Sequence, residues 1–243
     1  QAAQVLGATT LGGTSPFALN VNAATWQLTG TLTASAPLGK WGDGVLRLDG
    51  NNDATLFSPI TVNRGELRIT GPNAAGSVSQ AEGSGSLTMN FGTLRLAAQN
   101  TTTTNSTTTF FNSPNQHVTI AGRTTIIYDR NGGTPASGSN GATIGAAGLE
   151  FRTQNSPTIL FDQASFGDHL RINSELVVRD QPFIRVLDAT LIVNNIIRGN
   201  GTITKGDSYL MNFNNNAPNP DWTGGFTALQ GYSRVTPSAT NFT

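Results

Sequence analysis

Two histidines, His117 and His169, are the imidazole groups with which this chain could bind a metal ion or transfer protons near neutral pH. His169 directly follows Asp168, and Asp162 lies seven residues before it. This grouping could form a metal site or an acid–base pair. Each histidine also begins a short alternating segment, and that position favours a side chain that faces solvent or a neighbouring residue.

A second candidate is a stretch in which acidic side chains alternate with arginines. Enzymes that act on polysaccharides need paired carboxylates across a groove, or an acidic cluster that holds calcium beside a basic side chain. Acids stacked on one face could provide such a groove. Evenly spaced charges of both signs more often form a solvated ladder of weak surface pairs, and we favour that interpretation. The acids are Glu150, Asp162, Asp168, Glu175, Asp180 and Asp188, and the arginines are Arg152, Arg171, Arg179 and Arg185.

Aromatic side chains are the third candidate, because a row of them on the surface could stack on sugar rings. The alternative is that they fill wide corners of a hydrophobic core, since burial of apolar surface stabilises a protein by roughly 25 cal/mol per Å². We predict the core position for the tryptophans of this set. Its members are Trp26, Trp41, Trp222, Phe110 and Phe111.

The sequence motifs that mark common catalytic and cofactor sites do not occur. There is no Gly-x-Ser-x-Gly nucleophile turn, no P-loop, no glycine fingerprint of a dinucleotide site and no calcium-binding nonapeptide. We therefore predict no catalytic, cofactor-binding or metal-binding residues, and no cofactor.

The composition excludes several classes of partner. Lys plus Arg and Asp plus Glu both total 14, so no excess of positive charge is present to neutralise phosphates or an anionic membrane surface. Cysteine is absent, which excludes disulfides and thiolate chemistry. Only 12% of the 243 residues are charged, whereas 37% are hydrophobic and 28 are glycine. We expect a folded chain whose polar surface consists mostly of small uncharged side chains.

Short alternating segments run through the whole chain, whereas no apolar pattern of helical period is sustained. Most of the segments are three to five residues long, and residues that favour turns separate most of them. We expect strands at 25–29, 45–48, 60–62, 66–69, 86–89, 93–96, 117–120, 124–128, 148–151, 158–161, 169–172, 175–178, 183–187, 189–193, 201–204 and 209–213.

So many short strands favour a β-solenoid over the alternative, a β-sandwich, whose strands are usually longer and whose surface usually carries more charge. Each turn of a solenoid adds a few residues to each of several parallel sheets. Asparagines suit the corners, where their amides can bond along the axis; Asn51, Asn52 and Asn214–Asn216 are the candidates.

Two stretches of the chain share one plan, in which a strand flanked by glycine leads to an asparagine-rich corner, a second strand, a glycine turn and a third strand. The first stretch carries Lys40, Gly42, Gly44, Leu46, Leu48, Gly50, Asn52, Val62, Gly65, Leu67 and Ile69. The second carries Lys205, Gly206, Leu210, Asn214, Trp222, Thr223, Gly224, Gly225, Leu229, Gly231 and Val235.

This pattern resembles the autotransporter-associated β-strand repeat, also called the passenger-associated transport repeat. Leu56–Pro59 replaces the usual aromatic-Thr-Gly-Gly corner in the first copy, and Ser208 and Ser233 depart from the pattern in the second. The resemblance covers about a third of the chain. It implies a right-handed parallel β-helix in a large exported bacterial protein, where such repeats act as stalk or passenger scaffolding.

We therefore expect residues 1–243 to form one all-β solenoid module of a longer protein or filament. Loops should leave it at about 100–114 and 131–147, which are rich in Thr, Asn, Gly and Ser. The expected function is a cell-surface or extracellular scaffold, a stalk, coat or fibre, that associates end to end through open rungs. Surface polysaccharide is a further candidate partner. The alternative function is a β-helical lyase or glycosidase.

Overall fold

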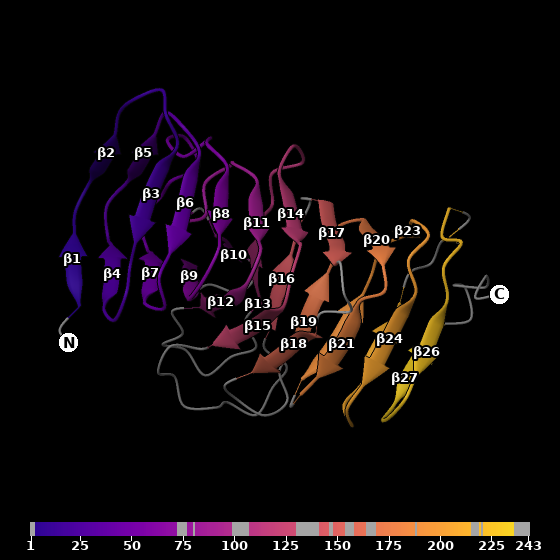
Figure 1. Ribbon diagram of the computed structural model, residues 1–243. Helices are drawn as coiled ribbons and strands as arrows, with labels where there is room; N and C mark the ends of the chain where they lie inside the picture. The colour runs from indigo at the N-terminus through magenta and orange to yellow at the C-terminus, as the bar shows by residue number, and fades with distance from the viewer. Residues whose placement is uncertain are drawn as a thin grey trace.

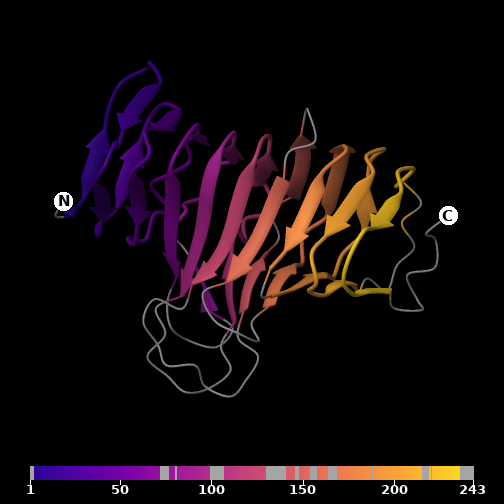
Figure 2. The same ribbon diagram turned by 60° about the horizontal axis from the view of Figure 1, so that its bottom comes forward.

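The computed structural model describes residues 3–71, 77–79, 81–98, 107–129, 141–145, 148–153, 158–163, 169–187, 189–214, 219 and 221–235. Within them the chain is all β-strand and turn, and every pair of neighbouring strands is parallel. The strands stack from the N-terminal end to the C-terminal end of an elongated molecule, in both views (Figures 1 and 2). The predicted parallel β-solenoid is thus confirmed.

Three sheets form the walls of the solenoid. Sheet 1 contains ten strands: β1 (Gln4–Leu6), β4 (Thr25–Leu28), β7 (Val45–Leu48), β9 (Glu66–Gly71), β12 (Gly92–Ala98), β15 (Thr124–Asp129), β18 (Thr158–Gln163), β21 (Phe183–Val186), β24 (Ile203–Gly206) and β26 (Phe226–Ala228). Sheet 2 contains seven: β10 (Ser77–Val78), β13 (Thr107–Phe110), β16 (Gly141–Ile144), β19 (His169–Ile172), β22 (Thr190–Val193), β25 (Met211–Phe213) and β27 (Ser233–Val235).

Sheet 3 contains eight strands: β3 (Phe17–Asn20), β6 (Leu38–Trp41), β8 (Ile60–Val62), β11 (Leu87–Met89), β14 (His117–Ile120), β17 (Gly148–Thr153), β20 (Leu176–Asp180) and β23 (Ile197–Arg198). A separate parallel pair joins β2 (Thr9–Leu11) and β5 (Leu32–Ala34). Through most of the molecule the chain passes from sheet 1 to sheet 2 to sheet 3 and then to the next strand of sheet 1. We call each such passage a rung.

The core lies between the sheets because each strand turns alternate side chains inward. In β7, Leu46 and Leu48 are fully buried while Arg47 points outward, and β9 repeats this pattern in register. Aliphatic and aromatic side chains from all three sheets join in one buried cluster. The burial accumulates from rung to rung.

Each of the two expected loop regions contains a strand. Within 100–114, Thr107–Phe110 forms β13, and within 131–147, Gly141–Ile144 forms β16. Both strands lie inside sheet 2, so the predicted excursions are wrong for these residues. Backbone pairing with neighbouring rungs holds these Thr-rich and Gly-rich segments in the sheet although they lack a strong apolar alternation. Residues 99–106, 130–140 and 146–147 lie outside the described residues.

Asparagines do form ladders at the corners, as predicted. Asn194 donates from Nδ2 to Oδ1 of Asn173 at 2.7 Å, and Asn214 donates to Asn194 at 3.2 Å. These residues follow β19, β22 and β25, which are consecutive strands of sheet 2. Each amide thereby satisfies part of its neighbour's hydrogen-bonding capacity along the axis.

Asn52 has a different and deeper role, because it is fully buried. Its Oδ1 accepts the backbone N–H of Leu32 at 2.6 Å, and its Nδ2 donates to the carbonyl of Ala81 at 2.5 Å. One side chain therefore links the preceding rung to the following one. Its neighbour Asn51 is exposed and accepts the N–H of Asp53 within the turn. Asn215 and Asn216 lie outside the described residues.

Candidate functional site

The histidines do not form a site among the described residues. His117 is the first residue of β14 and is exposed, and His169 is the first residue of β19 and is half-buried. Each histidine begins a strand, as predicted, and the two strands belong to different sheets. Asp168 lies outside the described residues, and the side chain of Asp162 is not described.

Two of the described acidic residues, Glu150 and Glu175, pair with arginines of neighbouring rungs. Glu150 of β17 contacts Arg179 of β20. Glu175 Oε2 lies 3.0 Å from Arg198 Nε, and the same arginine contacts Asp221. The Glu150–Arg179 pair agrees with the predicted ladder of surface pairs, whereas Arg198 and Asp221 were not among the predicted charges. Asp180 is exposed, and Asp188 lies outside the described residues.

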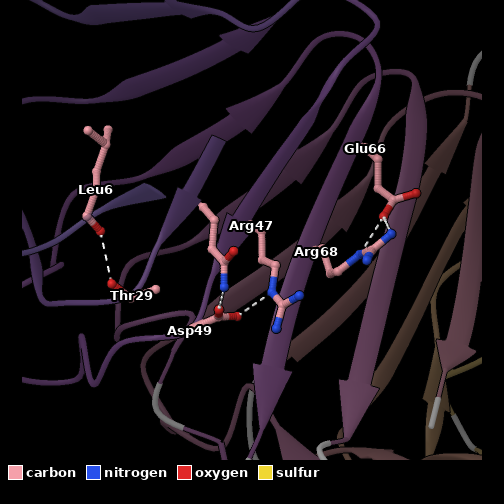
Figure 3. A network of polar contacts seen from close by, with 7 residues as sticks. Leu6, Thr29, Arg47, Asp49, Glu66 and Arg68 are labelled. Carbon is pink, nitrogen blue, oxygen red and sulfur yellow. Dashed lines mark hydrogen bonds and ion pairs between the residues drawn. The ribbon is translucent and has the colours of Figure 1, made fainter. Parts of the chain in front are cut away.

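Sheet 1 carries a second polar ladder, in which Arg47, Arg68 and Arg95 lie opposite one another in successive strands. Glu66 Oε1 is 2.8 Å from Arg68 (Figure 3). The same oxygen is 2.9 Å from Arg95 of the next strand. Asp49 accepts Arg47 Nε at 2.7 Å. Glu66 spans two rungs, so the outer face of this sheet is crossed by paired charges.

The core prediction made for the tryptophans holds for Trp222, which is 8% exposed and donates from Nε1 to the carbonyl of Gly201 at 2.9 Å. Phe110 and Phe111 are fully buried as well. Trp26 is half-buried against the core. Trp41 contradicts the prediction, because it is 51% exposed.

Trp41 is exposed because it ends β6 on the outward side of sheet 3. Its indole lies near Gly39, where an added Cβ would come within 3.2 Å of the Trp41 Nε1. Phe91, which follows β11 two strands along the sheet, is exposed as well. Asn90, the residue before Phe91, donates to Asn63 of the preceding rung at 2.8 Å. Trp41, Asn63 and Asn90 thus follow one another in successive rungs at the corner between sheets 3 and 1.

Both lysines of the chain, Lys40 and Lys205, occupy buried corners that sequence reasoning treated only as motif positions. Lys40 Nζ donates to the carbonyls of Gly42 at 2.9 Å and Arg64 at 2.7 Å. Burial lowers the pKa of Lys40 to about 8, although Asp43 and Glu66 oppose the shift. The ammonium caps carbonyls that a left-handed turn directs inward, since Gly42 has φ 78°.

The corner of the second repeat copy has the same construction. Lys205 Nζ donates to the carbonyls of Asp207 at 2.8 Å and Gln230 at 2.7 Å. Burial also lowers the pKa of Lys205. Asp207, with φ 67°, therefore corresponds to Gly42, and the expected match at Gly206 is wrong.

The asparagine of the second copy is also displaced from its expected position. Asn219, not Asn214, is the counterpart of Asn52, because its Oδ1 accepts the N–H of Ile197 from the preceding rung at 2.7 Å. The two copies also place their lysine in different sheets: Lys40 is in sheet 3, whereas Lys205 is in sheet 1.

A cleft that the sequence did not reveal lies where the turns of three successive rungs meet. It has a volume of about 470 Å³ and is lined by Asp53, Ser79, Glu82, Gly83, Asn112, Ser113 and Pro114. Glu82 is only 3% exposed, and its Oε1 accepts the N–H of Phe111 at 2.6 Å. Its Oε2 has no hydrogen-bond partner in the described part of the chain. Burial raises the pKa of the Glu82 carboxyl, which hydrogen bonds from Ser79 and Phe111 only partly offset.

In the sequence, Glu82 is a single acid in the glycine-rich turn 81–85. An acid in such a turn is expected to be exposed, and its burial becomes evident only from the inward fold of the turn.

Comparison with known proteins adds no relative: no protein-family model, curated protein or solved structure matches this chain. No helix in the described part is long and apolar enough to cross a membrane.

Proposed function

We propose that this chain is a structural scaffold module of a bacterial cell-surface or extracellular protein, a stalk, coat or fibre, whose end rungs stack on another copy. The observation that carries the proposal is the exposure of apolar side chains on the terminal rungs. At one end, Val5 and Leu6 of β1 are exposed. At the other, Leu229, Tyr232 and Val235 are exposed, and Tyr232 reaches 75%.

The geometry of the two ends favours head-to-tail stacking. β1 and β26 are the outermost strands of sheet 1, so each has one edge with no strand beside it among the described residues. A free strand edge presents a row of backbone donors and acceptors that a further strand can satisfy. Because all pairs are parallel, β26 of one copy can continue the ladder at β1 of the next. Such a heterologous contact does not close on itself and produces a filament.

The side walls support a scaffold over an enzyme. Glu150 and Glu175, two of the six acids on which the alternative of a lyase or glycosidase depended, contact arginines of neighbouring rungs. The recurring lysine corner supports the likeness to autotransporter passenger repeats, and with it the proposed export to the cell surface. The lysine corner gives a physical reason for the lysine and glycine of the repeat pattern.

Adhesion to a surface polysaccharide is a second part of the proposal, and the exposed Trp41 and Phe91 support it. Aromatic faces stack on sugar rings, and the Asn63 and Asn90 amides of the same corner can bond hydroxyl groups. Loss of polysaccharide pull-down in W41A and F91A, with normal binding by F57A, is the expected result. Equal binding by all three variants would contradict this part.

Self-association is tested by sedimentation velocity over a range of concentrations, with electron microscopy of the concentrated sample. We expect the wild-type chain to form linear oligomers and Y232K to remain monomeric, because a charge in the stacking surface lacks a partner. Phe57 provides the matched control: it is 67% exposed but lies in a side turn before β8. F57K should therefore assemble like the wild type. A wild-type chain that stays monomeric at high concentration would refute the end-to-end contact.

A further inference from the structure

The cleft around Glu82 presents an arrangement of groups that neither the scaffold nor the end contact uses. Asp53 comes from the turn between β7 and β8, Ser79 and Glu82 from the turn between β10 and β11, and Asn112 and Ser113 from the segment after β13. Three successive rungs thus supply oxygen-bearing side chains to one place. No Lys, Arg or His is among the residues that line it.

Glu82 is the group in this cleft that needs a partner. A carboxylate removed from water loses its solvation, which the hydrogen bonds from Ser79 and from the Phe111 N–H, the latter to Oε1 at 2.6 Å, only partly replace. Oε2 is closed to solvent and has no hydrogen-bond partner among the described residues. An isolated buried carboxyl either stays protonated or acquires a cation. The chain's own lysines are committed elsewhere, since both ammonium groups cap corner carbonyls.

We propose that this cleft binds a calcium ion, held by the carboxylates of Glu82 and Asp53 with neutral oxygen ligands from Asn112 and the serine hydroxyls. Calcium accepts six to eight oxygen ligands in irregular geometry, whereas magnesium requires a near-ideal octahedron and gives up its waters reluctantly. The described residues hold no group of three or more His, Cys, Asp or Glu side chains suited to a metal, so neutral oxygens and water must complete the shell. Such sites are weak, in the range of about 10⁻⁴ to 10⁻³ M for extracellular modules.

Two features favour an ion over a sugar substrate here. A sugar ring cannot reach Oε2, which is closed to solvent, whereas a bare cation is smaller than a water molecule. The ligands also come from three rungs that are already tied together, since Ser84 Oγ donates to the Asp53 carbonyl at 3.2 Å and Gln116 Nε2 to the Gly85 carbonyl at 2.8 Å. An ion at this point would clamp those rungs and stabilise the solenoid.

The experiment is a calcium titration of the chelator-treated protein, followed by thermal unfolding and by calorimetry, with magnesium in parallel. We expect the Tm to rise with calcium and much less with magnesium, because a ligand that binds only the folded state stabilises it. E82Q should abolish the calcium-dependent rise while retaining the acceptor oxygen for Phe111. D53N should weaken calcium binding at least tenfold.

The matched control is E66Q, which removes an acid of the sheet 1 ladder and should leave the calcium response unchanged. The absence of a calcium-dependent Tm shift in the wild type, or an equal shift in E82Q, would overturn the proposal. If E82Q fails to fold, D53N decides, since Asp53 is exposed and its substitution leaves the core intact. A D53N variant with the full calcium response would then refute the site.

Discussion

Lys40 and Lys205 make the same two contacts in different walls of the solenoid: each donates to the carbonyl two residues ahead and to a carbonyl in the next rung. The acceptors in the next rung, Arg64 and Gln230, each precede a glycine of positive φ, Gly65 at 77° and Gly231 at 74°. A side chain at either glycine would be strained, and at Gly65 a Cβ would come within 2.5 Å of Lys40 Nζ. The lysine and the glycine one rung later therefore form one unit.

These corners predict a rise in stability at alkaline pH. The pKa of Lys40 is about 8 in the folded chain against 10.5 when unperturbed, so between these values the unfolded state binds more protons. The free energy of unfolding should therefore increase as the pH rises from about 8 to 10.5. Urea unfolding of the wild type and of K40M at several pH values measures this. The increase should be smaller in K40M and absent in the double variant K40M/K205M; an unchanged profile in the double variant would contradict the assignment.

For Glu82 we expect the opposite dependence of stability on pH in calcium-free buffer. Because the pKa of Glu82 is raised above 4.5 in the folded chain, the folded state binds more protons than the unfolded state above that pH. Its contribution to stability is complete below about pH 4.5 and is lost as the pH rises through the folded pKa. E82Q should therefore be more stable than the wild type at pH 7, and this advantage should disappear at low pH. Equal stability at pH 7, measured by urea unfolding, would show that the carboxyl is not destabilising.

Asn52 and Asn51 are adjacent and chemically identical, which allows a direct test of the corner bridge. N52A removes the bonds to Leu32 and Ala81 and leaves a buried N–H and a buried carbonyl without that partner. We expect a loss of about 2–4 kcal/mol in the free energy of unfolding, since a buried unsatisfied group costs roughly 1–3 kcal/mol. N51A affects an exposed turn and should change stability by less than about 0.5 kcal/mol. Similar losses in the two variants would argue against the bridge.

The fold was predictable because aliphatic alternation is strong in most strands of sheet 1, such as Val45–Leu48, where prediction and structure agree. Strands of Thr, Gly and Ala, such as Gly141–Ile144, were missed because pairing with neighbouring rungs determines them more than their own pattern does. The same limit applies to Glu82. Nothing in its local sequence indicates that segments of the preceding and following rungs close around its turn.

Trp41 and Trp222 separate the two roles that tryptophan plays in this chain. W222A removes a buried ring and its bond to Gly201, and core Trp to Ala changes usually cost about 3–5 kcal/mol. W41A removes an exposed ring and should change the free energy of unfolding by less than about 0.5 kcal/mol. Chemical denaturation of both variants measures the difference, and the polysaccharide pull-down on W41A reports the proposed surface role separately. If W41A unfolded as readily as W222A, Trp41 would be a structural residue, and its exposure could no longer be taken as support for adhesion.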